Sequence, residues 1–491
     1  MALLGAQLVI TLVMISIIQK LGPHFSLARW ILCSTGLIRY LYPTNTELRQ
    51  VANVPKDKAK NKKAGKQNGR IEHKAETFHI PRNVDVELET AKVCSLDVIH
   101  LRYYPEYQWL VDFSLYAALV YIVTEVYQIW FPIKDEINLS MLWCFLVIIF
   151  SIKILLSLTV QYFRGEESVG ERSTCICMGF TYLLISMMVL IVDENTLEVG
   201  LETAYTSFNK SAAIFLDRQG LSSTGPASKI VLKFFMALWC GLLGALLTFP
   251  GLRIARMHWD MLKYFRDRRV VQLLLNLSFA LPFLLVIAWI KPVSRNYLTV
   301  RIFSGMTEPL LTPAAFDTLR IVAIVFTFLL KLCIMPWYLQ AYLDMAYHRV
   351  EEQKKEAGRI TNVDFQKKIA AVFYYLCVVT IQYLAPLIMC LYMGIMYKTL
   401  GEYSWRGLYV EPADEECALG APPSVVGDSS EAADSIVKSA ENFHMALDSL
   451  KSVFTVDVFR GLFGFGTWWC CFLYFGTTSV GLVYQSYFSQ S

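Results

Sequence analysis

The chain has 491 residues, of which 55% are hydrophobic and only 18% are charged, and its formal net charge at pH 7 is +4. Its mean hydropathy of +0.42 lies well outside the range of ordinary soluble domains. A soluble globular protein is therefore excluded, and we expect a protein that crosses the lipid bilayer many times. No nucleic-acid partner is expected.

Nine apolar stretches are long enough to form membrane-spanning helices. A hydrocarbon core of roughly 30 Å needs about 20 apolar residues in a helix. The stretches lack the alternation of a barrel strand, so the predicted fold is an all-α polytopic bundle of about nine transmembrane helices with interfacial amphipathic helices. In chain order the predicted spans are residues 3–18, 109–130, 139–160, 175–192, 230–252, 270–290, 316–338, 369–396 and 462–484.

These spans divide the chain into five regions. In chain order they are a first transmembrane segment at 1–19, a basic cytosolic loop at 20–108, a seven-helix core at 109–396, an outer loop at 397–458, and a last transmembrane helix with a short cytosolic tail at 459–491.

Positive charge predicts the orientation, because Lys and Arg near span ends are retained in the cytosol. With the N-terminus outside, the cytosolic connections carry 29 of these residues and the outer ones 12. We therefore predict an outer N-terminus and a cytosolic C-terminus, in the plasma membrane or the secretory pathway. Asn209 begins an Asn-Lys-Ser sequon in an outer connection, so it is a predicted glycosylation site. A cleaved signal peptide is the alternative for the first span, although its basic residues follow the apolar run.

The long connections differ in composition. Residues 56–70 carry seven cations against one acid, which predicts either an unfolded tether or attraction to anionic lipid headgroups. Residues 26–42 are predicted to form a helix at the membrane interface. In the outer loop, an acidic disordered stretch at 411–431 is predicted to precede an amphipathic helix at 436–454.

Two signals predict structure beside the spans on the cytosolic side. Apolar residues at helical spacing in 253–269 indicate that the preceding helix continues out of the membrane. Thr361 and Asp364 are placed to cap the helix that leads into the eighth span.

Ionisable residues inside the predicted spans are the candidate functional residues, since a charge at mid-membrane costs about 2.5 to 3.5 kcal/mol on insertion scales and usually has a partner. Glu125 lies at a depth similar to that of Arg320 and Lys233, so we predict an outer cluster that pairs it with one of these two. In chain order the candidates are Asp112, Glu125, Lys153, Lys233, Arg320 and Lys331.

A second, inner cluster is predicted from the remaining three charges. Asp112 lies near the inner end of its span, and we pair it with Lys153 or Lys331 on helices that run in the opposite direction. Both clusters have two interpretations. They form a site linked to ion sensing or conduction, or they only hold the helices together.

Catalytic signatures are absent from the sequence, including a phosphate-binding loop, a zinc-protease motif and a nucleophile elbow. We therefore predict that the protein is not an enzyme, and we expect neither a cofactor nor a metal site.

Short segments along nearly the whole chain resemble the transmembrane protein 161 family in their order and spacing. Asp112, Glu125 and Arg320 fall inside these segments, whereas Lys233 does not. The segments are SLARW at 26–30, EYQW at 106–109, VDF at 111–113, VTEV at 123–126, GERS at 170–173, LTFPGLR at 247–253, FDTLR at 316–320, LQAYL at 339–343, EAGRI at 356–360 and TWW at 467–469.

The resemblance implies a regulator of membrane excitability. Members of this family are linked to modulation of potassium and calcium currents in excitable tissue, including cardiac rhythm, and to protection against oxidative stress. We therefore expect a multipass membrane protein that regulates cation currents through partner ion-channel subunits. The alternatives are protection against oxidative stress, transport of a small solute or ion, and a structural membrane scaffold.

Overall fold

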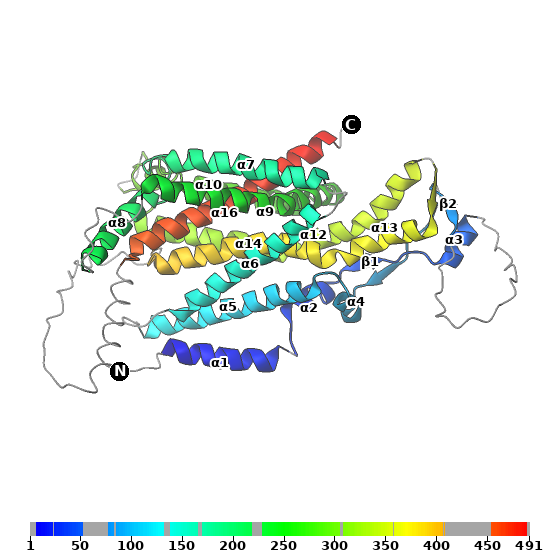
Figure 1. The fold of residues 1–491 in the computed structure, drawn as a ribbon, viewed down its shortest axis with the longest axis horizontal. Coiled ribbons are helices and arrows are strands. Elements are labelled where there is room, and N and C mark those ends of the chain that lie inside the picture. The colour runs from blue at the N-terminus through cyan, green and yellow to red at the C-terminus, as the bar shows by residue number, and fades with distance from the viewer. Residues whose placement is uncertain are drawn as a thin grey trace.

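The protein is an elongated bundle of helices that run roughly side by side along its long axis (Figure 1). The computed structural model describes residues 6–22, 24–52, 77–82, 85–131, 138–164, 169–218, 228–304, 308–356, 358–405, 407 and 453–488. The predicted tether at 56–70, the acidic stretch at 411–431 and most of the predicted helix at 436–454 lie outside these residues.

The described elements are mostly helices. The helices are α1 (Ala6–Leu21), α2 (Leu27–Cys33), α3 (Asn45–Val51), α4 (Ser95–Ile99), α5 (Tyr104–Trp130), α6 (Leu139–Arg164), α7 (Val169–Ile191), α8 (Leu201–Arg218), α9 (Lys229–Tyr264), α10 (Arg269–Ile287), α11 (Arg295–Thr299), α12 (Pro313–Lys355), α13 (Asn362–Tyr374), α14 (Leu376–Leu400) and α16 (Val456–Phe488). The strands are β1 (Ile38–Tyr40), β2 (His79–Pro81), β3 (Thr90–Lys92) and β4 (Arg359–Thr361).

The all-α polytopic fold is confirmed, but the count of nine spans is not. Among the described residues, seven helical stretches are long and apolar enough to cross a membrane, namely α5, α6, α7, α9, α10, α12 and the α13–α14 pair. Helix α1 has only 16 residues. Helix α16 has 33 residues, but Gly, Thr, Trp and Tyr replace many of the aliphatic residues that give a high hydropathy.

Two features that the sequence predicted beside the spans are confirmed, namely a helix extension and a helix cap. Helix α9 continues from its apolar part to Tyr264. Thr361 is the N-cap of α13, and its hydroxyl accepts a hydrogen bond from the backbone N–H of Asp364 at 3.1 Å. Helix α13 ends at Tyr374 and α14 begins at Leu376, so the predicted eighth span is divided between two helices.

Successive long helices alternate in direction, so the connections collect at two opposite ends of the bundle. Helix α8 and the N-terminal end of α1 lie at one end in Figure 1, and α3, β2 and the start of α13 lie at the other. We call these the α8 end and the β end. They correspond to the predicted outer side and the predicted cytosolic side.

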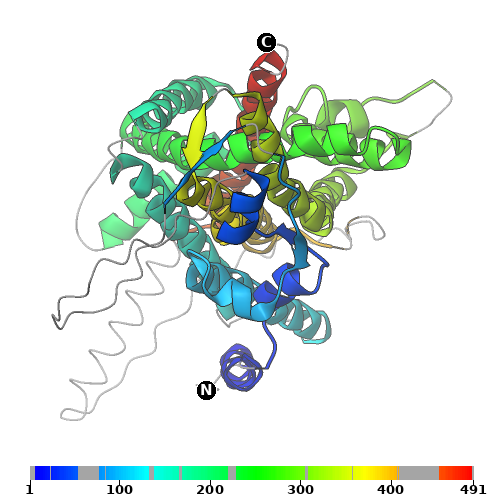
Figure 2. The same cartoon turned by 90° about the vertical axis from the view of Figure 1, so that its right-hand side faces the viewer.

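Helix α14 occupies the middle of the bundle. It contacts α5, α6, α9, α12 and α16. The end-on view shows α14 surrounded by the other helices (Figure 2). In the most apolar 18-residue stretch of Asn362–Leu400, 89% of residues are buried, against 50% or less in the other six candidate spans. The axis of the bundle is therefore filled by a helix.

Small residues allow α9 and α16 to cross closely. A Cβ atom added at Gly481 would lie 2.5 Å from the Cβ of Ala255, and one added at Gly251 would overlap the side chain of Thr477. Close backbone approach through small residues is a usual means of helix association in membranes. Gly481 of α16 and Gly251 of α9 therefore serve packing between the two helices.

The β end contains a small folded layer in place of a long interfacial helix. The predicted helix at 26–42 is wrong in its length, because α2 stops at Cys33 and Gly36 adopts a φ of +79° before β1. Strand β1 pairs with β3, and β2 pairs with β4 from the α12–α13 connection, both antiparallel. These pairs attach the first long loop to the helical core.

Candidate functional site

A buried charge cluster at the α8 end is centred on Arg320 of α12, whose side chain is only 1% exposed. Its Nη2 donates hydrogen bonds to Asp317 Oδ1 at 3.0 Å and to the hydroxyl of Tyr397 at 2.7 Å. Its Nη1 lies 3.9 Å from Glu198 Oε2. The guanidinium carbon lies 4.7 Å from the ring centroid of Trp289, at cation–π distance. Arg320 is therefore held by two carboxylates, a phenol and an aromatic face.

A second arginine completes the cluster. Arg295 of α11 forms an ion pair with Glu198 and lies 3.8 Å from Asp317. Two guanidinium groups thus face two carboxylates, and their formal charges cancel. We call Glu198, Arg295, Asp317 and Arg320 the arginine quartet. Such compensation is what a buried charge requires.

The quartet differs from the predicted outer cluster in its members. Only Arg320 was predicted, and its proposed pairing with Glu125 is wrong because Arg320 lies against Glu198 of the α7–α8 connection and Trp289 after α10. The spacing of Asp317 and Arg320, three residues apart on one helix, was a signal for an ion pair that sequence reasoning missed. Glu198 lies in the α7–α8 connection, and no local sequence pattern predicts that it meets Arg295 and Arg320.

A polar cavity of about 320 Å³ lies beside the arginine quartet. Its walls come from the α7–α8 connection, the start of α8, the α10–α11 connection, the end of α14 and the start of α16. They contain acidic, basic and phenolic side chains. The lining residues are Glu194, Asn195, Glu198, Val199, Gly200, Thr203, Lys291, Tyr397, Tyr403, Asp457 and Arg460.

Glu125 pairs with Lys398, which sequence reasoning had not included. Lys398 Nζ lies 2.6 Å from Glu125 Oε2, and the side chains are 9% and 15% exposed. Trp405 Nε1 donates to the same oxygen at 3.2 Å. Lys398 was missed because the predicted span ended at residue 396, whereas α14 continues to Leu400. The predicted partners of Glu125 are therefore wrong, because α14 is the neighbour of α5 at this depth.

Lys233 of α9 lies at the α8 end, away from Glu125. Its ammonium donates to the backbone carbonyl of Leu190 at 2.7 Å and lies 4.0 Å from Glu202 Oε2. Glu202 also pairs with Lys229. This group is half exposed, and its acid comes from α8 rather than from a span.

The predicted inner cluster does not form. Asp112 accepts hydrogen bonds from the hydroxyl of Ser26 at 2.7 Å and from the backbone N–H of Ala28 at 3.1 Å. A carboxylate at a helix N-terminus satisfies donors that would otherwise lack partners. Asp112 thus fastens α2 to α5 and contacts neither predicted lysine.

The two lysines of that predicted cluster lie apart. Lys153 is exposed on α6, and its ammonium is 6.0 Å from the ring centroid of Phe150. Lys331 is buried in α12, where its ammonium lies 3.4 Å from the hydroxyl of Ser278 and 4.8 Å from the ring centroid of Tyr474. The side chains of α6 and α12 point to different neighbours. The depth of a residue along the membrane does not show which neighbour its side chain meets.

Asn209 lies within α8 and is half-buried. The predicted outer connection around it is therefore a helix for much of its length. The structure places the sequon at the α8 end of the bundle, together with the arginine quartet.

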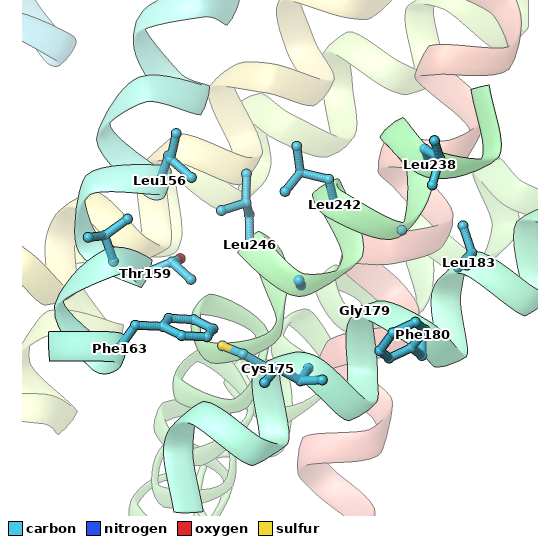
Figure 3. Close-up of a pocket in the computed structure, with 14 residues that line it drawn as sticks. Leu156, Thr159, Phe163, Cys175, Gly179, Phe180, Leu183, Leu238, Leu242 and Leu246 are labelled. Atoms are coloured by element: carbon cyan, nitrogen blue, oxygen red, sulfur yellow. The ribbon is translucent and has the colours of Figure 1, made fainter. Parts of the chain in front are cut away.

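An apolar groove of about 360 Å³ lies on the lateral surface between α6, α7 and α9. The side chains of Phe163, Leu242 and Leu246 line a common space in Figure 3, and Gly179 of α7 also lines it, where an added Cβ atom would lie 3.3 Å from the Cβ of Ala245. Phe180, on the same wall, is 63% exposed. Such a surface suits contact with lipid chains or with the apolar helix of another membrane protein.

The comparisons with known proteins agree with the architecture. A family model described as "Predicted transmembrane protein 161AB" matches residues 2–489, which is nearly the whole chain. No solved structure matches. The match includes all residues of the arginine quartet and of the Glu125–Lys398 pair. The chain is a multipass membrane protein that belongs to the transmembrane protein 161AB family.

Proposed function

We propose that this protein regulates potassium and calcium currents through contact with channel subunits, and that it neither conducts ions nor catalyses a reaction. The observation that carries the non-conducting part is the position of α14 in the middle of the bundle. A helix whose apolar stretch is 89% buried leaves the axis to packed side chains rather than to water. Ion conduction needs a polar or hydrated path across the membrane.

The placement of the charges supports the same proposal. Arg320 is neutralised within the arginine quartet, and Glu125 is paired with Lys398. Both groups lie near the α8 end, so they do not form a series of sites along the membrane normal. Compact, paired charges are suited to fixing helices in place.

The lateral surface offers the area that contact with a channel subunit requires. Phe180, Leu184 and Met188 follow one another at one-turn spacing on α7 and are 61% to 63% exposed. Helices associate in membranes by packing such apolar faces. The proposed regulator therefore contacts the channel subunit through its lateral surface, within the plane of the membrane.

Recording in two settings tests this proposal. In cells that carry potassium and calcium currents, removal of the protein is expected to change current density, and re-expression to restore it. The purified protein in planar lipid bilayers is expected to be silent. Unitary currents in the bilayer would overturn regulation by contact, and unchanged currents in the cells would overturn regulation altogether.

We also propose that the α8 end faces the lumen or the exterior and that the C-terminus lies in the cytosol. The excess of basic residues in the opposite connections supports this orientation. Treatment with an N-glycosidase is then expected to increase the mobility of the wild-type chain and leave Asn209→Gln unchanged. A tag at the N-terminus that is protected from external protease, while one at the C-terminus is digested, would contradict the orientation.

A further inference from the structure

Some of the charged side chains that line the polar cavity beside the arginine quartet have partners within the protein, and others do not. Glu198 is engaged with Arg295 and Arg320. Glu194 accepts hydrogen bonds from the backbone N–H and the hydroxyl of Thr203 at the start of α8. These acids have structural partners.

Lys291 and Asp457 are different. Within the described part of the chain, neither side chain has an ion pair or a hydrogen bond with another residue, although both line the cavity. Arg460 lies one helical turn from Asp457, yet its Nε donates to the backbone carbonyl of Gly401 at 2.7 Å and its guanidinium stacks 5.1 Å from the ring centroid of Tyr403. Asp457 is exposed and Lys291 is half-buried, so charges of both signs stay open to the cavity without an ion pair between them among the described residues.

Separated charges of both signs complement a molecule that also carries both. We infer that this cavity binds a small zwitterion that has one ammonium and one carboxylate group, such as a neutral amino acid. Lys291 and Arg460 face its carboxylate, and Asp457 faces its ammonium. The volume of about 320 Å³ lies at the lower end of the roughly 300–1,000 Å³ of small-molecule sites.

The position of the cavity would let such a ligand contact several elements of the bundle at once. Tyr397 lines the cavity and also accepts the hydrogen bond from Arg320, and its hydroxyl donates to Tyr403 at 2.9 Å. A bound zwitterion would thus join the start of α16 and the α10–α11 connection to the end of α14. The inference concerns binding alone and holds whether or not currents are regulated.

Binding to the full-length purified protein in lipid nanodiscs tests the inference. The probes are glycine, L-alanine and L-leucine, with ethylamine and propionate as matched analogues that each lack one charge of alanine. At millimolar concentrations, at least one amino acid is expected to raise the unfolding temperature and to bind saturably by calorimetry, whereas the two analogues do not. Equal binding of the analogues, or no binding by any of the three amino acids, would overturn the inference.

Variants identify the site. Lys291→Gln and Asp457→Asn are each expected to weaken amino-acid binding by about 10-fold or more, since a hydrogen bond to a charged group contributes about 1.5–3 kcal/mol. Both variants are expected to fold, because the protein itself does not pair these charges. Arg301→Gln, which removes an exposed cation after α11 and outside the cavity, should bind like the wild type. Wild-type affinity in both Lys291→Gln and Asp457→Asn would place the ligand elsewhere and refute the assignment.

Discussion

Lys398→Met is expected to destabilise the folded protein by about 3–5 kcal/mol, the usual cost of removing one partner of a buried ion pair. The substitution leaves the carboxylate of Glu125 with uncharged neighbours, which include Trp405 Nε1 and the hydroxyl of Thr399. An uncompensated charge at this depth is expensive because water does not replace the lost ammonium. Reversible unfolding in lipid or detergent, followed by tryptophan fluorescence, gives the free energy.

Two further variants show whether the loss of stability comes from the broken ion pair or from replacing a lysine as such. Glu125→Gln combined with Lys398→Met is expected to recover much of the stability, because no buried charge then remains. Lys92→Met, which removes an exposed lysine of β3 outside the predicted spans, should change the free energy of unfolding by less than about 0.5 kcal/mol. If Lys398→Met changed the free energy of unfolding as little as this control does, the Glu125–Lys398 pair would contribute nothing to stability.

Arg320→Met is expected to have an effect of similar size, about 3–5 kcal/mol, because it breaks the charge balance of the arginine quartet. Asp317 and Glu198 would then share the single guanidinium of Arg295. The variant also loses the cation–π contact with Trp289 and the hydrogen bond to Tyr397. The same unfolding measurement applies.

Arg320→Lys is expected to rescue little of this stability. An ammonium cannot reproduce a planar group whose Nη2 donates to both Asp317 and Tyr397 while its Nη1 lies near Glu198 and its face stacks on Trp289. Asp317→Asn combined with Arg320→Met should be more stable than Arg320→Met alone, since one carboxylate is removed with one cation. The matched control is Arg301→Met, because this exposed cation contacts only the rings of Tyr297 and Phe303 among the described residues. Full rescue by lysine would show that charge alone matters at this position.

Both charge groups act on the same end of α14. Tyr397 contacts Arg320, and the next residue, Lys398, contacts Glu125. Successive helical residues point in different directions, so one turn of α14 is fixed to α12 on one side and to α5 on another. Loss of either group should therefore loosen the end of the helix that fills the bundle.

The sequence by itself determined the features that depend on local pattern. Continuous apolar runs predicted where the long helices lie, because a helix satisfies its own backbone in lipid. Thr361 with Asp364 predicted the start of α13, since a cap involves residues three apart. The family resemblance was also carried by short segments, and the match over residues 2–489 confirms it.

Only the tertiary structure decided which charges meet. Depth along the membrane placed Glu125 level with Arg320, but depth does not state which helix is the neighbour, and α5 presents Glu125 to α14 instead. Asp112 is satisfied by α2, a segment outside the predicted spans. The partners of a buried charge are fixed by how helices rotate and pack around one another, and this arrangement depends on contacts between residues far apart in the chain.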